Sequence, residues 1–83
     1  MSTEFELEQF MELVFQEVRR QNEKCGHQYH SPDTWVTILT EEVGEVAHDA
    51  LNLNQQGFLN ELVQVAAVAY QAYKTNQSEE CDL

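Results

Sequence analysis

Two short acidic motifs combine residue types and spacings that suit a metal ion. Glu42 and Glu45 stand three residues apart in one apolar segment, and Glu61 stands three residues before Gln64 in another. In a helix, positions three apart are neighbours on the surface, so each motif places its two side chains on one face. No lysine or arginine lies three or four positions away to relieve the repulsion between these carboxylates. An external cation is the simplest remedy, and hard oxygen ligands favour Mg²⁺, with Mn²⁺ as the alternative.

The residues around the two motifs resemble those of a known family. They follow the pattern Trp35-x3-Leu39-x-Glu41-Glu42-x-Gly44-Glu45-x-Ala47, then Glu61-Leu62-Val63-Gln64-Val65-Ala66-Ala67-Val68-Ala69. This pattern resembles the MazG-like all-α nucleoside triphosphate pyrophosphohydrolases over roughly residues 19–73. The preceding loop, Lys24-x-Gly26-x-Gln28-x-His30-Ser31, is similar to that of small single-domain members. The resemblance implies Mg²⁺-dependent cleavage of the α–β phosphoanhydride of a nucleoside or deoxynucleoside triphosphate, giving a monophosphate and pyrophosphate.

By this resemblance, Glu42, Glu45, Glu61 and Gln64 are the expected metal ligands. The family has Asp where this chain has Gln64, whose amide oxygen can bind Mg²⁺ but brings no negative charge. The sequence therefore favours one metal ion over two, and it leaves open a catalytically weak or inactive relative that only binds nucleotide. Glu41 is the candidate for orienting the attacking water or acting as general base.

Two further residues are candidates for binding the substrate. Lys24 could lie near the phosphates and stabilise charge on the leaving pyrophosphate, or it could only complement the end of a helix. Trp35, or else Tyr29, could offer a stacking surface to the base, although packing in the core is the alternative for Trp35. The sequence has no glycine-rich phosphate loop and no Ser-His-Asp set, so the expected nucleophile is water.

Composition limits the classes of partner. The 83 residues carry a formal net charge of −11, from 15 acidic and 4 basic side chains. This charge argues against a nucleic acid polymer or an anionic membrane as partner, but not against a nucleotide held through a metal. It also supports a rival from another class, a small acidic protein-interaction module. Two cysteines and no apparent secretion signal lead us to expect a cytoplasmic protein.

The pattern of apolar residues predicts an all-α fold with three helices in one domain, residues 1–75, and a disordered acidic tail, residues 76–83. The first helix is expected over about residues 4–24, where Gly26 ends it. The second begins after Ser31, with Pro32 in its first turn. A polar turn over residues 52–57 precedes the third, expected over about residues 58–75.

The third helix indicates a partner chain. Its apolar residues surround the helix instead of forming a stripe, and a helix of this kind must be covered on all sides. A chain this short buries only about 60% of its unfolded surface and cannot supply that cover alone. We therefore expect a homodimer or a dimer of dimers built around a MazG-like intersubunit helical bundle, with a monomeric three-helix bundle as the alternative.

Overall fold

The computed structural model describes residues 3–77, which form three helices and no strand. The helices are α1 (Thr3–Cys25), α2 (Pro32–Leu51) and α3 (Gln55–Gln77). The all-α prediction is thereby confirmed for this part of the chain. Residues 78–83 of the predicted tail, including Cys81, lie outside the described residues. None of the described helices combines the length and apolar character needed to cross a membrane.

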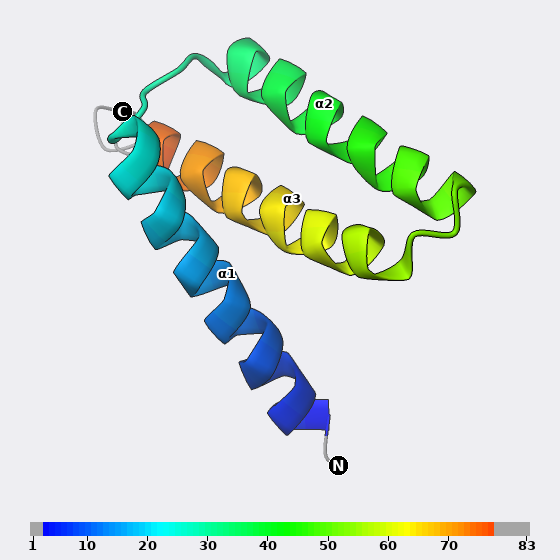
Figure 1. Cartoon of the computed structure of the whole chain (residues 1–83). Coiled ribbons are helices and arrows are strands. Elements are labelled where there is room, and N and C mark those ends of the chain that lie inside the picture. Colours follow the sequence, from blue (N-terminus) through cyan, green and yellow to red (C-terminus); the bar gives the residue numbers. More distant parts are fainter. Residues whose placement is uncertain (1–2, 78–83) are drawn as a thin grey trace.

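Two helices run side by side and the third diverges from them. Figure 1 shows α2 and α3 as an antiparallel pair, with the C-terminal end of α1 beside the C-terminal end of α3. α3 packs against both other helices, whereas α1 and α2 do not approach each other closely. The N-terminal half of α1 projects away from the pair (Figure 1). α3 is therefore the element that joins the molecule together.

The small core lies along one side of α3. The described residues that are buried and apolar are Val14, Trp35, Ala67 and Val68. Much of the remaining apolar surface is exposed, including Leu7, Met11 and Phe15 on the projecting half of α1. On α3, Leu62, Tyr70 and Tyr73 are exposed as well. A single copy of this chain therefore leaves part of its apolar third helix exposed.

The turn between α2 and α3 is shorter than the sequence suggested. α3 begins at Gln55, three residues before the predicted start, because Asn54 caps it: the Asn54 Oδ1 atom accepts a hydrogen bond of 3.1 Å from the Gly57 amide. Leu53 ends the preceding turn with a φ of 55°, a left-handed conformation that favours glycine. Only residues 52–54 separate the two helices.

The other end of α3 also extends beyond the prediction. Asn76 and Gln77 are helical, although both were expected in the disordered tail. The Asn76 Nδ2 atom donates to the Ala72 carbonyl at 3.0 Å and to the His30 carbonyl at 3.4 Å. The second of these bonds joins the end of α3 to the loop between α1 and α2, so tertiary contact stabilises the last turn. At the end of α1, Gly26 has a φ of 72° and closes the helix as predicted.

Candidate functional site

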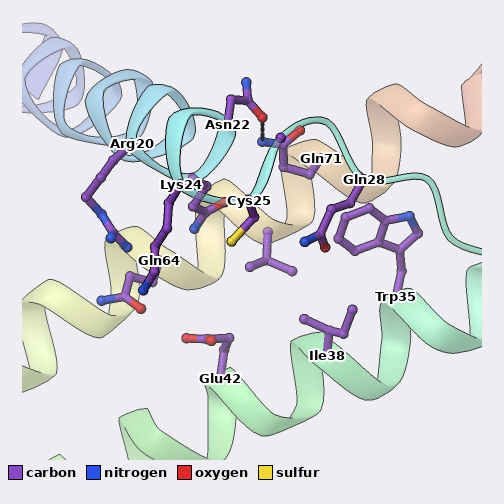
Figure 2. A pocket seen from close by; sticks show the side chains of 13 residues that line it. Arg20, Asn22, Lys24, Cys25, Gln28, Trp35, Ile38, Glu42, Gln64 and Gln71 are labelled. Atoms are coloured by element: carbon purple, nitrogen blue, oxygen red, sulfur yellow. Dashed lines mark hydrogen bonds between the residues drawn. The ribbon is translucent and has the colours of Figure 1, made fainter.

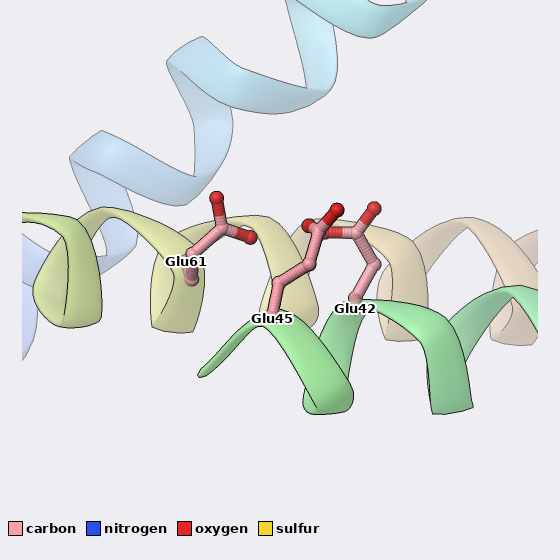
Figure 3. A group of neighbouring side chains, drawn as sticks. All are labelled: Glu42, Glu45 and Glu61. Atoms are coloured by element: carbon pink, nitrogen blue, oxygen red, sulfur yellow. The ribbon is translucent and has the colours of Figure 1, made fainter. Parts of the chain in front are cut away.

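Three glutamates from two helices converge at the interface of α2 and α3. Each of Glu42, Glu45 and Glu61 offers one carboxylate oxygen, and these oxygens all lie within 4.8 Å of one another. Figure 3 shows Glu42 and Glu45 rising from α2 toward the side on which Glu61 leaves α3. We call these three residues the acidic cluster. The structure thus brings together the three carboxylates that the sequence suggested as ligands.

The short turn between the helices accounts for this convergence. Because only three residues connect α2 to α3, the end of α2 must lie antiparallel to the start of α3. Glu42 and Glu45, in the second half of α2, then face Glu61, in the first half of α3. Spacing within each helix and the length of the turn together determine which carboxylates meet.

The acidic cluster is incompletely satisfied. The Oε2 atoms of Glu42 and Glu61 are buried and have no hydrogen-bond partner. Within residues 3–77, the only ion pair joins Arg20 to Glu17, so no lysine or arginine neutralises the cluster. Buried polar atoms without partners destabilise a fold by about 1–3 kcal/mol each, and more when they are charged. The two buried oxygens therefore lack a partner among the described residues.

The pKa values of the acidic cluster reflect how close together its carboxylates lie. Burial, together with the neighbouring carboxyls of Glu45 and Glu42, raises the pKa of Glu61 to about 7. Burial and the charge of Glu45 also raise the pKa of Glu42. Two perturbed carboxyls in one cluster are typical of functional sites, although structural clusters produce the same effect.

A cavity of about 310 Å³ adjoins the acidic cluster and includes Glu42 in its wall. It lies between the end of α1, the following loop, α2 and α3, and its volume is at the lower end of small-molecule sites. Three other predicted residues, Lys24, Trp35 and Gln64, line the same cavity. Four of the sequence candidates therefore share one cavity, and the other two metal candidates stand beside its Glu42 wall.

Gln64 lies on the cavity side of the acidic cluster. Figure 2 shows its amide group converging with the side chain of Lys24, above the carboxylate of Glu42. Gln64 and Glu42 therefore line the same cavity.

Trp35 is packed in the core and also borders the cavity. It is 6% exposed, and its indole Nε1 atom donates a hydrogen bond of 3.1 Å to Thr75 Oγ1 on α3. The ring of His30 meets the indole edge-on, with 4.8 Å between centroids. Trp35 is therefore a core residue that also forms a wall of the cavity. Tyr29, the alternative stacking residue, is 74% exposed and is not in this wall.

Other candidates are less well placed. Glu41 is exposed on α2 and does not line the cavity, so the protomer does not bring this candidate base to the other residues. Gly44 is also exposed, and nothing lies within 4 Å of the position that a Cβ atom would take. The close approach of a neighbouring backbone, which would explain a mid-helix glycine, is therefore absent from residues 3–77.

Sequence reasoning missed the contribution of α1 to the electrostatics. Glu17 is half-buried and its charge helps to raise the pKa of Glu42. Arg20 forms a two-pronged ion pair with it, with Nε to Oε1 at 2.9 Å and Nη2 to Oε2 at 2.6 Å. These bonds lower the pKa of Glu17. The three-residue spacing of Glu17 and Arg20 could be seen in the sequence. The approach of α1 to the acidic cluster could not, because it depends on how α1 packs on α3.

Comparison of the chain with protein-family models, with curated proteins and with solved structures returns no significant match. The resemblance to the MazG-like family therefore rests on the motif residues, and the site must be interpreted from its own geometry.

Proposed function

We propose that this chain is a Mg²⁺-dependent nucleotide pyrophosphohydrolase of the MazG-like type. The observation that carries the proposal is the convergence of Glu42, Glu45 and Glu61 beside a cavity that also contains Lys24 and Trp35. An acidic cluster alone would support only cation binding. A cavity with an indole wall, an amine and a neighbouring set of hard oxygen ligands suits a nucleotide better than a bare ion.

The donor atoms fit a magnesium ion. The acidic cluster supplies carboxylate oxygens only, two of them buried without partners. Glu42, Glu45 and Glu61 would hold the ion, with Gln64 at the edge of the site. Bound there, Mg²⁺ supplies charge neutralisation at the phosphate oxygens.

Lys24, Trp35 and Glu41 have separate roles in this proposal. Lys24 has no acidic partner among the described residues and lines the cavity, so its ammonium is available to the phosphates. Trp35 limits the space for the base and excludes water from that side. The attacking group is water, directed at the α–β phosphoanhydride. Glu41 stays the proposed residue for orienting that water, and its exposed position makes Glu41→Gln an informative variant.

The active form in this proposal is a homodimer or a dimer of dimers. The exposed apolar side chains of α3 and of the projecting half of α1 support it, because large apolar patches on a small chain mark interaction surfaces. A second copy would cover both and would complete an intersubunit helical bundle.

The test is a pyrophosphate-release screen across the common nucleoside triphosphates, with Mg²⁺ and with EDTA. We expect Mg²⁺-dependent release from at least one nucleotide. Glu42→Gln and Glu45→Gln keep the size of the side chain but remove a ligand charge, and each should lower the rate at least 100-fold. The matched control is Glu8→Gln, an exposed position on the projecting half of α1. Undiminished release in the two cluster variants would remove the proposal.

One observation favours a second candidate, a relative that binds nucleotide with little or no hydrolysis. Gln64 leaves the site with three carboxylates, and Figure 2 places it beside Lys24. The two candidates separate in one experiment, the melting of the protein with Mg²⁺ and a non-hydrolysable nucleotide. A raised melting temperature without pyrophosphate release from the matching substrate would identify the binding protein. If no nucleotide raises it, the acidic interaction module becomes the better explanation.

A further inference from the structure

The cavity has two chemically different ends. Glu42, Gln64 and Lys24 lie at the end beside the acidic cluster, and Trp35 with Gln28 lies at the other (Figure 2). If phosphates occupy the charged end, as the proposed function requires, the base must lie toward Trp35 and Gln28. The polar side chain that faces the base then determines which bases are accepted.

Gln28 is held in one orientation by a neighbour. Its Oε1 atom lies 3.1 Å from the Nε2 atom of His30. A carboxamide oxygen can only accept, so this contact is a hydrogen bond when Nε2 of His30 carries a proton. His30 is itself positioned by the edge-on contact with Trp35 and by the bond from Asn76 to its carbonyl. Rotation of the Gln28 amide by 180° would place two donors against each other.

The other end of the Gln28 amide is free. No acceptor within residues 3–77 is hydrogen-bonded to its Nε2 atom. Figure 2 shows the amide pointing into the cavity, next to the indole of Trp35. When Nε2 of His30 carries a proton, the cavity therefore presents a donor to a planar group that lies along the tryptophan.

We propose that Gln28 is a specificity-determining residue that selects bases with a ring carbonyl on the edge facing it and discriminates against adenine. This inference rests on the proposed function. A carbonyl oxygen accepts the Gln28 N–H, whereas the exocyclic amino group of adenine places a donor against a donor. Bases with a carbonyl there gain a hydrogen bond that adenine cannot make through its amino group. An enzyme of this kind would spare ATP, the nucleotide it must not deplete.

The decisive comparison uses inosine and adenosine triphosphates: hypoxanthine has a 6-carbonyl and an N1–H, whereas adenine has a 6-amino group and an unprotonated N1. We expect kcat/KM to be at least about tenfold higher for the inosine nucleotide. Gln28→Glu keeps the length of the side chain but presents only acceptors, so it should lower the ratio by removing the bond to the 6-carbonyl. Gln28→Met removes both kinds of partner and should bring the ratio near one. Each variant changes one loop residue that is exposed, so the fold should survive.

A second variant tests the role of the neighbour. His30→Phe keeps an aromatic ring against Trp35 but cannot donate to Gln28, so the amide is free to rotate. We expect the ratio of kcat/KM for the inosine nucleotide to kcat/KM for the adenosine nucleotide to fall toward one, because kcat/KM for the adenosine nucleotide rises. A merely structural role for His30 would lower both values together and leave their ratio unchanged, which would overturn the assignment.

Binding separates this inference from the proposed function. The rise in melting temperature is measured with Mg²⁺ and the α,β-methylene analogues of both nucleotides. A larger rise with the inosine analogue supports the inference even where hydrolysis is absent. Equal shifts, or a larger one with the adenosine analogue, would overturn it while leaving pyrophosphate release to stand. If neither analogue binds, both proposals fail.

Discussion

Removing the charge of Glu61 should stabilise the metal-free protein at neutral and alkaline pH. The pKa of Glu61 is raised from an ordinary value of 4.5 to about 7. A carboxyl with a raised folded-state pKa destabilises the fold when it ionises. This cost is absent below pH 4.5, grows as the pH rises, and is complete above about pH 7. Metal-free protein should therefore lose stability across this range, in the direction opposite to that of a salt-bridged acid.

The size of the effect follows from the same values. A pKa difference of this size corresponds to an upper limit of about 3 kcal/mol. Because Glu61 is only partly buried and shares its protons with two neighbouring carboxyls, we expect about 1–2 kcal/mol after solvent screening. For a chain of this length, that free energy raises the melting temperature by roughly 5–15 °C.

The assay is thermal melting of the parent and of Glu61→Gln in EDTA at one protein concentration. At pH 8 the variant should melt higher by this amount, and at pH 4.5 the two proteins should melt together. Glu41→Gln is the matched control, because it removes a charge from the exposed surface next to the acidic cluster. Saturating Mg²⁺ should reverse the order at pH 8, since a ligand at 100 times its Kd adds about 2.7 kcal/mol to the parent only. A difference that is the same at both pH values would refute the reasoning.

Three further predictions concern the rest of the structure. Gln64→Asp adds a fourth carboxylate near the acidic cluster, so it should lower the Mg²⁺ concentration needed for half-maximal activity; an unchanged requirement would show that this side chain does not reach the metal. Tyr70→Glu, on the exposed face of α3, should convert the oligomer into a 9.6 kDa monomer in light scattering. A parent that is already monomeric would contradict this expectation. Trp35→Phe should lower the free energy of unfolding by about 1–2 kcal/mol through loss of the bond to Thr75. A double-mutant cycle with Thr75→Val should then show non-additive losses.

Local chemistry made the helices predictable. Gly26, Ser31 and Pro32 marked the end of α1 and the start of α2, and both boundaries lie within one residue of expectation. The start of α3 was wrong by three residues because the cap formed by Asn54 was not recognised in an amide-rich turn. Its end was wrong by two because a tertiary bond from Asn76 to the loop stabilises the final turn. A tertiary hydrogen bond of this kind cannot be recognised from a local pattern of residues in the sequence.

Only part of the candidate site could be predicted from the sequence. The three glutamates could be predicted because helical spacing and a resemblance both pointed to them. Glu17 could not, since it affects Glu42 only because tertiary packing brings α1 close to the acidic cluster. That Gln64 and Lys24 line one cavity likewise depends on how α1 packs on α3. The sequence thus indicated which side chains are chemically able to bind a metal or a substrate. Packing determined which of them face one another.

The three-residue turn between α2 and α3 has a consequence for the order of folding. All three carboxylates of the acidic cluster belong to this helical hairpin, whereas the cavity also requires α1 and the loop after it. Contacts that are local in sequence form early, because they close short loops. We therefore expect the hairpin to form in the folding transition state with its carboxylates already opposed. A divalent ion would then act mainly by accelerating folding, and it would leave the rate of unfolding nearly unchanged.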